Sequence, residues 1–372
     1  MKFTAPKDKM VKSISIAESI IPSRPQMQIL KNILLETNGN KVNVTSADLE
    51  VGIKNKFDAN IESEGSITVN GSKFLGIIRE LPDADIFFEV EENNNISIKS
   101  TNTSVKANFT LKGIQKEDFP APHDVDIDKP HFSIPQKDIK EMIRKTIFSI
   151  SLETSRHYLN GIFFETNGNN LKLVSTDGRR LAYIEKDFET KFDQEVRAIV
   201  PQKVLNELAR HLEDEGLVDI VFTQNKVFFS FNDINIVSSL IDGNFPDYNQ
   251  VIPKNQEKFA KVNTQILSQS LNRSSLYVED KFNHIKVDFS KNHIVISINN
   301  ADIGTFREEL SIEYDGDPIE IALNHKYLKE YLKDIHSSEI LIEMNTPLSP
   351  VTIKNEDDEN YIYVVMPMKV SG

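Results

Sequence analysis

Histidines and paired carboxylates are the residues with which this chain could carry out acid–base or metal chemistry. Asp83 and Asp85 form an acidic pair, but Pro82 precedes them, and a turn explains this pattern better than a metal site. No two of the eight histidines stand at the spacing of a metal-binding pair: His123, His131, His157, His211, His284, His293, His325 and His336. The chain has no cysteine, which excludes thiol nucleophiles and cysteine-ligated metals.

Motifs for phosphate binding and hydrolysis are missing as well. Asn70–Lys73 reads NGSK and lacks both the upstream glycine and the trailing hydroxyl residue of a P-loop. Neither H-E-x-x-H nor G-x-S-x-G occurs. The sequence therefore predicts a protein that is not an enzyme, with no catalytic residue, no cofactor and no metal.

Length and composition predict several domains without a membrane segment. The chain has 372 residues, too many for one ordinary core, with 39% hydrophobic and 27% charged residues. Lys and Asp interrupt the apolar positions of Met1–Ile20, so the start lacks the apolar core of a signal peptide. No later segment is apolar for long enough to cross a membrane. We expect a cytoplasmic protein.

One strand pattern occurs three times along the chain, at Asn38–Lys54, Asn167–Glu185 and Lys291–Leu310. Each copy has an asparagine-rich turn and apolar residues at every second position, which is typical of strands with one buried face. A strand followed by a helix comes next in each copy, at Ser66–Leu81, Arg197–Leu212 and Ile319–Ile335. In the middle copy an apolar stripe at helical spacing supports the helix: Val204, Leu205, Leu208 and Leu212.

A hairpin-like pair of strands follows every copy, and each repeat also opens in a similar way. The hairpins start near Asp85, Asp219 and Glu339, and the openings place Phe3, Phe132 and Phe259 before an amphipathic helix. We therefore predict three similar domains at residues 1–125, 126–254 and 255–372, each α+β with two helices and antiparallel sheets. Repetition alone also fits an ordinary multidomain scaffold.

Charge is distributed unevenly between the predicted helices and the rest of the chain. The helices carry 15 Lys and Arg against 8 Asp and Glu, a net charge of +7, and the remainder carries −20. They are predicted at Pro6–Ile20, Ser72–Glu80, Gln136–Phe148, Gln202–Leu212, Thr264–Leu276 and His325–Ile335. A helical surface of this kind could hold DNA by its phosphates, although the chain as a whole has a net charge of −13. The alternative is that lysine and arginine, as good helix formers, simply occupy solvated faces.

No zinc finger, basic zipper or RNA-binding motif accompanies this charge, so any DNA contact is predicted to be independent of sequence.

Four segments resemble the bacterial β sliding clamps, the β subunits of DNA polymerase III: RHYLNGIFFET at Arg156–Thr166, STDGRRLA at Ser175–Ala182, GNFPDYNQVIP at Gly243–Pro253 and YVVMPMK at Tyr363–Lys369. Ser23–Pro25 and Asp118–Pro120 are similar to segments of the family's first domain. The resemblance covers essentially the whole chain.

The resemblance implies a processivity factor in DNA replication, built as a head-to-tail homodimer. Six similar domains would close a ring around double-stranded DNA, with helices inside and sheets outside. The partners implied are the DNA polymerase III catalytic subunit, the clamp loader and other replication and repair proteins with short clamp-binding motifs. The alternatives are an enzyme on a triplicated scaffold, or a structural oligomer that does not encircle DNA.

By the same resemblance, a groove between the second and third domains binds those motifs, typically glutamine followed by leucine and phenylalanine. The matching positions are Leu159, Thr176, Gly178, Arg179, Arg180, Leu181, Pro246, Val251, Tyr327, Leu348, Val364, Val365, Met366, Pro367 and Met368. Two methionines and several valines would make an adaptable apolar pocket. Two rim positions depart from the family: Arg179 stands where His or Tyr is frequent, and Gln250 where some members have Arg.

DNA contacts and the dimer interface are implied in the same way. Arg24 matches a loop residue used on the duplex, and a second contact loop is expected at Arg156, His157 and Tyr158. Candidate pore residues, by helix membership alone, are Lys12, Lys73, Lys140, Arg144, Lys203 and Lys329. The interface should join the edge strand with Phe109 and Leu111 to the region Leu276, Tyr277 and Val278 of a second copy.

Overall fold

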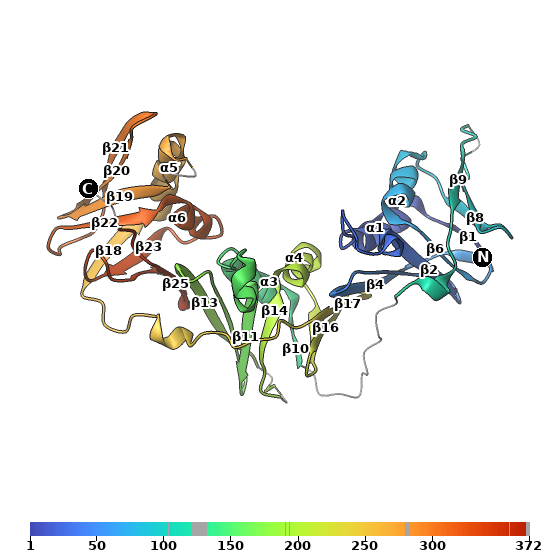
Figure 1. Cartoon of the computed structure of the whole chain (residues 1–372), viewed down its shortest axis with the longest axis horizontal. Coiled ribbons are helices and arrows are strands. Elements are labelled where there is room, and N and C mark those ends of the chain that lie inside the picture. The colour runs from blue at the N-terminus through green and yellow to red at the C-terminus, as the bar shows by residue number, and fades with distance from the viewer. Residues whose placement is uncertain are drawn as a thin grey trace. The chain divides into compact units, whose positions relative to one another are not determined.

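The computed structural model describes residues 1–102, 104–120, 132–189, 191–192, 194–279, 283–356 and 358–369. These residues form six α-helices and 25 strands (Figure 1). The helices are α1 (Lys7–Glu18), α2 (Gly71–Glu80), α3 (Gln136–Ile147), α4 (Gln202–His211), α5 (Thr264–Ser274) and α6 (His325–Leu332).

The strands follow a similar order in each third of the chain, with one additional strand, β5, in the first. The first third holds β1 (Lys2–Ala5), β2 (Asn32–Asn38), β3 (Lys41–Ala47), β4 (Val51–Asp58), β5 (Asn60–Ser63), β6 (Ser66–Asn70), β7 (Ile86–Val90), β8 (Asn95–Ser100) and β9 (Asn108–Lys112). The second holds β10 (Phe132–Pro135), β11 (Gly161–Asn167), β12 (Asn170–Thr176), β13 (Arg180–Asp187), β14 (Arg197–Pro201), β15 (Leu217–Phe222), β16 (Lys226–Phe231) and β17 (Ile234–Ser239). The last holds β18 (Lys258–Asn263), β19 (His284–Ser290), β20 (His293–Asn300), β21 (Gly304–Ser311), β22 (Ile319–Asn324), β23 (Glu339–Met344), β24 (Val351–Asn355) and β25 (Asp358–Val365).

Asparagine side chains start three of the helices. Asn70 accepts a hydrogen bond from the backbone of Lys73, Asn263 from Ile266, and Asn324 from Lys326. These caps satisfy amide groups that the first turn of a helix leaves without partners. Two of them, at α2 and α6, fix the predicted transition from strand to helix.

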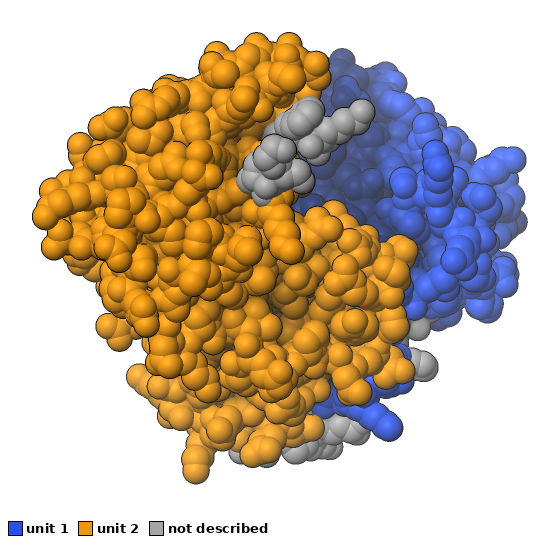
Figure 2. All heavy atoms as spheres, turned by 60° about the vertical axis from the view of Figure 1, so that its left-hand side comes forward, with its two compact units in different colours: residues 1–138, 203–240 blue, residues 139–202, 241–372 orange. Residues whose placement is uncertain are grey.

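Two compact units account for the described fold, and Figure 2 colours unit 1 blue and unit 2 orange. Unit 1 is residues 1–138 with 203–240, and unit 2 is residues 139–202 with 241–372. Unit 1 holds the sheets β5-β1-β7-β8-β9 and β10-β15-β16-β17-β4-β3-β2-β6. Unit 2 holds β14-β11-β12-β13-β25-β24-β23-β18 and β21-β20-β19-β22. All strand pairs in these sheets are antiparallel, and each unit contains part of the middle repeat.

The predicted α+β fold with three repeats is confirmed, and all six predicted helices are present. The repeated strand patterns become β3 with β4, β12 with β13, and β20 with β21. The stripe Val204, Leu205, Leu208 and Leu212 of the middle repeat is buried. No helix among the described residues is both long and apolar enough to cross a membrane. The exact domain boundaries stay a prediction.

One repeat opening was placed one residue too early. Phe3 and Phe132 are buried in β1 and β10, but Phe259 in β18 is 50% exposed. Ala260 takes the buried position that lies four residues before helix α5. A phenylalanine one position away from the true counterpart points to the other face of the strand, because side chains alternate.

Candidate functional site

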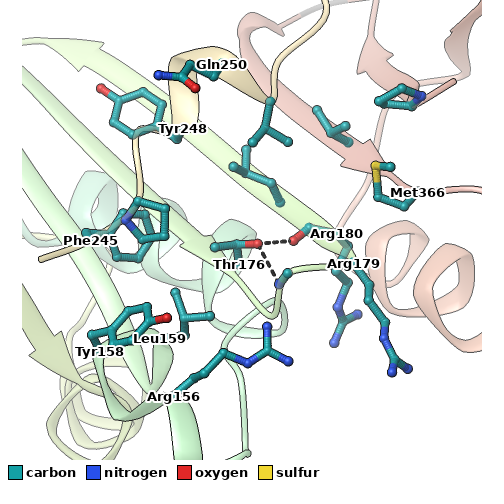
Figure 3. A pocket seen from close by; sticks show the side chains of 16 residues that line it. Arg156, Tyr158, Leu159, Thr176, Arg179, Arg180, Phe245, Tyr248, Gln250 and Met366 are labelled. Carbon is teal, nitrogen blue, oxygen red and sulfur yellow. Dashed lines mark hydrogen bonds between the residues drawn. The ribbon is translucent and has the colours of Figure 1, made fainter.

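A groove of about 460 Å³ lies in unit 2, where β13 pairs with β25 and the segment after β17 passes alongside (Figure 3). This volume lies within the range of pockets that bind small ligands or peptide side chains. The lining residues are Arg156, Tyr158, Leu159, Thr176, Gly178, Arg179, Arg180, Leu181, Phe245, Pro246, Tyr248, Gln250, Val251, Pro350, Val364 and Met366. We call this the unit 2 groove.

An aromatic and aliphatic cluster forms the floor of the unit 2 groove. Phe245 stacks on Phe163 with ring centroids 4.9 Å apart, and Tyr248 packs on the same cluster. Leu181 and Val364, which face each other across β13 and β25, complete it. An apolar floor of this kind favours leucine and phenylalanine side chains in a ligand.

A short polar chain anchors Tyr248 beneath the rim. Its hydroxyl donates to Glu165, whose other oxygen lies 2.6 Å from Arg197 Nη1. Burial, together with the hydrogen bond to Glu165, raises the pKa of Tyr248, so the phenol stays protonated at neutral pH. Tyr248 is therefore a fixed neutral element of the floor.

The turn between β12 and β13 shapes one wall of the groove. Asp177 Oδ1 accepts the backbone N–H groups of Arg179 and Arg180 at 2.9 and 3.1 Å. Thr176 Oγ1 donates to the carbonyl of Arg180 and accepts from Gly178 N (Figure 3). Gly178 has φ +85°, and a Cβ there would lie 2.7 Å from Arg156 Nη1. The positive φ favours glycine at this position, and any larger residue would also displace the Arg156 side chain.

Polar side chains make the rim. Arg156 pairs with Glu153 at 2.8 Å, and Gln250 Nε2 donates to Asp247 at 2.9 Å. The hydrogen bonds from Gln250 and Asn249 lower the pKa of Asp247 and keep it ionised. The exposed side chain of Arg179 adds a positive charge at the mouth. A ligand with an acidic residue close to Arg179 would complement the positive charge there.

Ten of the fifteen residues expected in the groove line it: Leu159, Thr176, Gly178, Arg179, Arg180, Leu181, Pro246, Val251, Val364 and Met366. The other five do not belong to its lining in the described part of the chain. Val365 is fully buried because it follows Val364 on the strand and faces the opposite way. Tyr327 lies under Arg180, Leu348 is exposed, and Pro367 and Met368 continue past the groove, with Met368 N bonded to Ala322 O.

Several lining residues were missed by the sequence analysis. Phe245 and Tyr248 lie in a segment between domains, where no periodic pattern reveals a buried face. The aromatic pair in GNFPDY was the available signal. Arg156 and Tyr158, expected on DNA, are brought into the groove lining, while His157 is bonded to Asp242 O at 3.0 Å.

The candidate DNA-contacting residues differ in how accessible they are. Arg24, Lys12, Lys73, Arg144 and Lys329 are exposed, and Lys140 is half-buried. Lys203 is different: its ammonium group donates to Ile20 O at 3.1 Å and pairs with Asp48. These contacts within unit 1 point to a structural role for Lys203 rather than to contact with DNA.

Of the candidate interface residues, Phe109 and Leu111 lie on an edge strand, and Leu276 and Tyr277 lie in a short helix that contacts another edge strand. β9, with Phe109 and Leu111, is the last strand of its sheet, and β21 is the last strand of another. The short helix η5 (Ser275–Tyr277) contacts β21, with the Tyr277 and Phe306 rings 5.9 Å apart. Leu276 beside them is 74% exposed. Both regions present the backbone edges and apolar side chains that a partner strand would cover.

Three antiparallel α+β repeats in one chain are the fold of the DNA sliding clamps. The models of the DNA polymerase III beta subunit match its N-terminal domain at residues 1–123, its central domain at 133–247 and its C-terminal domain at 249–369. The Beta sliding clamp of Treponema pallidum is 31% identical over 99% of this chain and 100% of its own. That of Vibrio cholerae is 31% identical over the full length of both.

Solved structures agree with the sequence comparison. A DNA polymerase sliding clamp from Bacillus subtilis has a TM-score of 0.94 at 28% identity, covering 100% of both chains. A sliding clamp from Pseudomonas aeruginosa, bound to griselimycin, has a TM-score of 0.93 at 30% identity, also covering 100% of both. The chain belongs to the family of DNA polymerase III beta subunits, the bacterial beta sliding clamps.

Proposed function

We propose that this chain forms a head-to-tail dimeric ring around duplex DNA and tethers replication and repair proteins through the unit 2 groove. The observation that carries the proposal is the groove itself, an apolar floor with a charged rim in a chain of the sliding clamp family. The clamp acts without catalysis: it keeps its partners on DNA because leaving requires opening the ring.

The groove chemistry suits a short linear motif rather than a folded surface. Leu181, Val364 and Met366 offer apolar contacts, while Gln250 and Arg179 offer polar groups at the mouth. A motif of glutamine followed by leucine and phenylalanine meets both requirements. The DNA polymerase III catalytic subunit, the clamp loader and other motif-bearing proteins are the proposed partners.

Charge and edge strands support the proposed dimer. Lys106 and Lys112 lie at or near β9, while Glu309 and Asp302 lie at or near β21. All four side chains are exposed, so opposite charges would meet when the two edges pair. A head-to-tail contact that closes under rotation gives a cyclic dimer.

DNA would be held by phosphate contacts from helices and loops. Lys12 on α1, Lys73 on α2, Arg144 on α3 and Lys329 on α6 are exposed, and Arg24 is exposed ahead of β2. Each contact of this kind is independent of base sequence and weakens with salt. Such contacts let a ring slide.

The test is retention on DNA of different topology. The protein is loaded onto nicked circular DNA with the matching clamp loader and ATP, and the complex is separated by gel filtration before and after the circle is cut. We expect retention on the circle and release on linearisation. Equal retention on both forms would contradict encirclement.

A further inference from the structure

Arg180 lines the unit 2 groove, yet its guanidinium group is used elsewhere. The residue is only 7% exposed. In Figure 3 the side chains of Arg179 and Arg180 extend away from Tyr248 and Gln250, which lie on the far side of the groove. A ligand in the groove would therefore meet the backbone and stem of Arg180 rather than its charge.

Three elements share the guanidinium group of Arg180. Nε donates to Asp177 Oδ2 at 3.0 Å, Nη1 to Glu330 Oε2 at 2.5 Å, and Nη2 to the carbonyl of Phe148 at 2.5 Å. The same group lies 4.3 Å from the ring centroid of Tyr327. Arg180 thus links the groove wall to the end of α3 and to α6. A planar guanidinium with a fixed fork of donors is suited to such a joint, and a lysine is not.

Glu330 reaches Arg180 from outside the groove. It lies on α6 and is not among the described residues that line the groove. Its second oxygen is 3.8 Å from Lys326 Nζ, one turn earlier on the same helix. Removing the Glu330 carboxylate would therefore break the link between Arg180 and α6, while the hydrogen bonds to Asp177 and Phe148 and all the lining residues remain.

The corresponding place in unit 1 lacks this joint. Val51 holds the position of Arg180 in the repeat, and Glu207 on α4 holds that of Glu330. Because valine replaces the arginine across the junction, the carboxylate of Glu207 accepts from Ser19 Oγ at 2.5 Å and pairs with Arg210 of its own helix at 3.2 Å. The pocket beside Val51 is about 150 Å³, against about 460 Å³ for the unit 2 groove. The large groove is therefore found at the junction that has the hydrogen bonds of Arg180, and the small pocket at the junction that lacks them.

We propose that Arg180 is a positioning residue for peptide docking: through Glu330 and the Phe148 carbonyl it holds the groove wall open, and it does not read the ligand's charge. This inference rests on the proposed function of the groove as a peptide site. Pre-organised walls bind more tightly because less ordering remains to be done on binding.

The test compares two substitutions at opposite ends of the joint. Arg180→Met keeps an apolar stem in the groove wall, and Glu330→Ala leaves every lining residue in place. Binding is measured by calorimetry on the full-length protein with two synthetic peptides, Gln-Leu-Ser-Leu-Phe with and without a flanking aspartate. Each variant should bind both peptides about tenfold more weakly, and the double variant should lose little more.

Two controls separate positioning from other roles. Lys326→Gln removes the other partner of Glu330 and should leave both affinities unchanged. Arg179→Gln should weaken only the aspartate-bearing peptide. Thermal unfolding checks that each variant is folded at the measuring temperature, and if Arg180→Met does not fold, Glu330→Ala carries the test.

Each contrary outcome has a distinct meaning. Glu330→Ala with wild-type affinity for both peptides would overturn the inference while the docking function stands. The inference is also overturned if Arg180→Met loses affinity for the aspartate-bearing peptide alone. A wild-type protein that binds neither peptide would contradict the docking function itself.

Discussion

Two strand junctions in this molecule share one backbone plan but differ in what they can bind. In unit 1, β4 pairs with β17 so that Gly52 faces Val237, and Ser239 N donates to Glu50 O. In unit 2, β13 pairs with β25 so that Leu181 faces Val364, and Met366 N donates to Arg179 O. The register is the same in both, so the difference between them lies in the turn before β4 or β13, where Gly178 but not Leu49 has a positive φ, and in the side chains.

Side chains at matching positions explain the different pockets. Leu49, Gly52, Lys226 and Ser239 in unit 1 stand where unit 2 has Gly178, Leu181, Pro350 and Met366. The unit 1 pocket therefore lacks the apolar floor and is about a third of the volume, at about 150 Å³ against about 460 Å³. A repeated fold can thus carry a large apolar groove at one junction and only a small pocket at another.

The helices behind the two junctions are also packed differently. Unit 2 buries the tyrosines of β25 and α6, with Tyr331 and Tyr363 stacked at 4.8 Å and Lys145 paired with Asp358 at 2.8 Å. At the matching places unit 1 has aliphatic residues: Leu208, Ile236 and Ile16. Directional hydrogen bonds and ion pairs fix geometry more tightly than aliphatic contacts, which suits a junction that must present a site.

The largest effect on peptide binding is expected from Gly178→Leu. This substitution places in the turn of unit 2 the residue that unit 1 has at the matching position, Leu49. The left-handed backbone at Gly178 strains any residue with a side chain, and a leucine there would also displace the Arg156 guanidinium group that lies 2.7 Å from the Cβ position. We expect peptide affinity to fall by about a hundredfold or more, roughly 3 kcal/mol. Fluorescence anisotropy with a labelled motif peptide measures it. Leu49→Gly in unit 1 is the matched control, and a loss of affinity there would contradict the comparison.

The second largest effect on peptide binding is expected at the apolar floor of the unit 2 groove. Leu181→Ala with Met366→Ser removes the apolar contacts that unit 1 lacks at Gly52 and Ser239. Losing most of two buried side-chain contacts should cost about 2–3 kcal/mol of binding free energy. Calorimetry would show a rise in Kd with one site per chain retained. Unchanged affinity would place the ligand's apolar anchors elsewhere.

An acid-dependent effect is expected in unit 1. Glu207 is buried, which would raise its pKa, but His211, the donating Ser19 hydroxyl and Arg210 outweigh burial and lower it. The ionised carboxylate therefore stabilises the folded state at pH values above 4.5, the ordinary pKa of a glutamate. This contribution is lost as the pH falls through the lowered pKa of Glu207. Glu207→Gln should cost about 1 kcal/mol at pH 7 and progressively less below pH 4. Urea unfolding across this range tests it, and a constant difference would contradict the assignment.

The smallest effect concerns Lys203. Because its ammonium group is tied to Asp48 and Ile20, Lys203→Met should lower the stability of unit 1 by about 0.5–1 kcal/mol. It should leave the salt dependence of DNA binding unchanged, whereas Lys329→Gln should reduce the slope by about one. If Lys203→Met changes the slope equally, the lysine contacts DNA after all.

The repeated elements could be predicted because they rest on local patterns. Alternating apolar residues predicted the strands β3, β12 and β20. The repeated strand–helix pattern predicted the helices α2, α4 and α6. The pairing of β17 with β4 and of β25 with β13 joins strands that are distant in sequence, and no local period encodes such pairs. The assignment of Phe259 failed for a related reason, since the face of a strand changes with a shift of one residue.

The groove was predicted in part, and through resemblance rather than through spacing. Residues of the β12–β13 turn and around the end of β25 carry distinctive motifs, which is why Thr176, Gly178 and Met366 were expected in the groove that they line. Phe245 and Tyr248 were missed because they lie in an irregular segment, whose packing depends on contacts with Phe163 formed only in the folded chain. The positioning role proposed for Arg180 could not be predicted from the sequence, because its partner Glu330 is 150 residues away along the chain.

The most direct test of this account is a peptide titration followed through methyl signals of the full-length protein. We expect one peptide per chain, with shifts at Leu181, Val364 and Met366 and none at Leu49, Val51 or Val237. Two peptides per chain, or shifts centred on the unit 1 residues, would contradict the claim that only unit 2 carries the docking site.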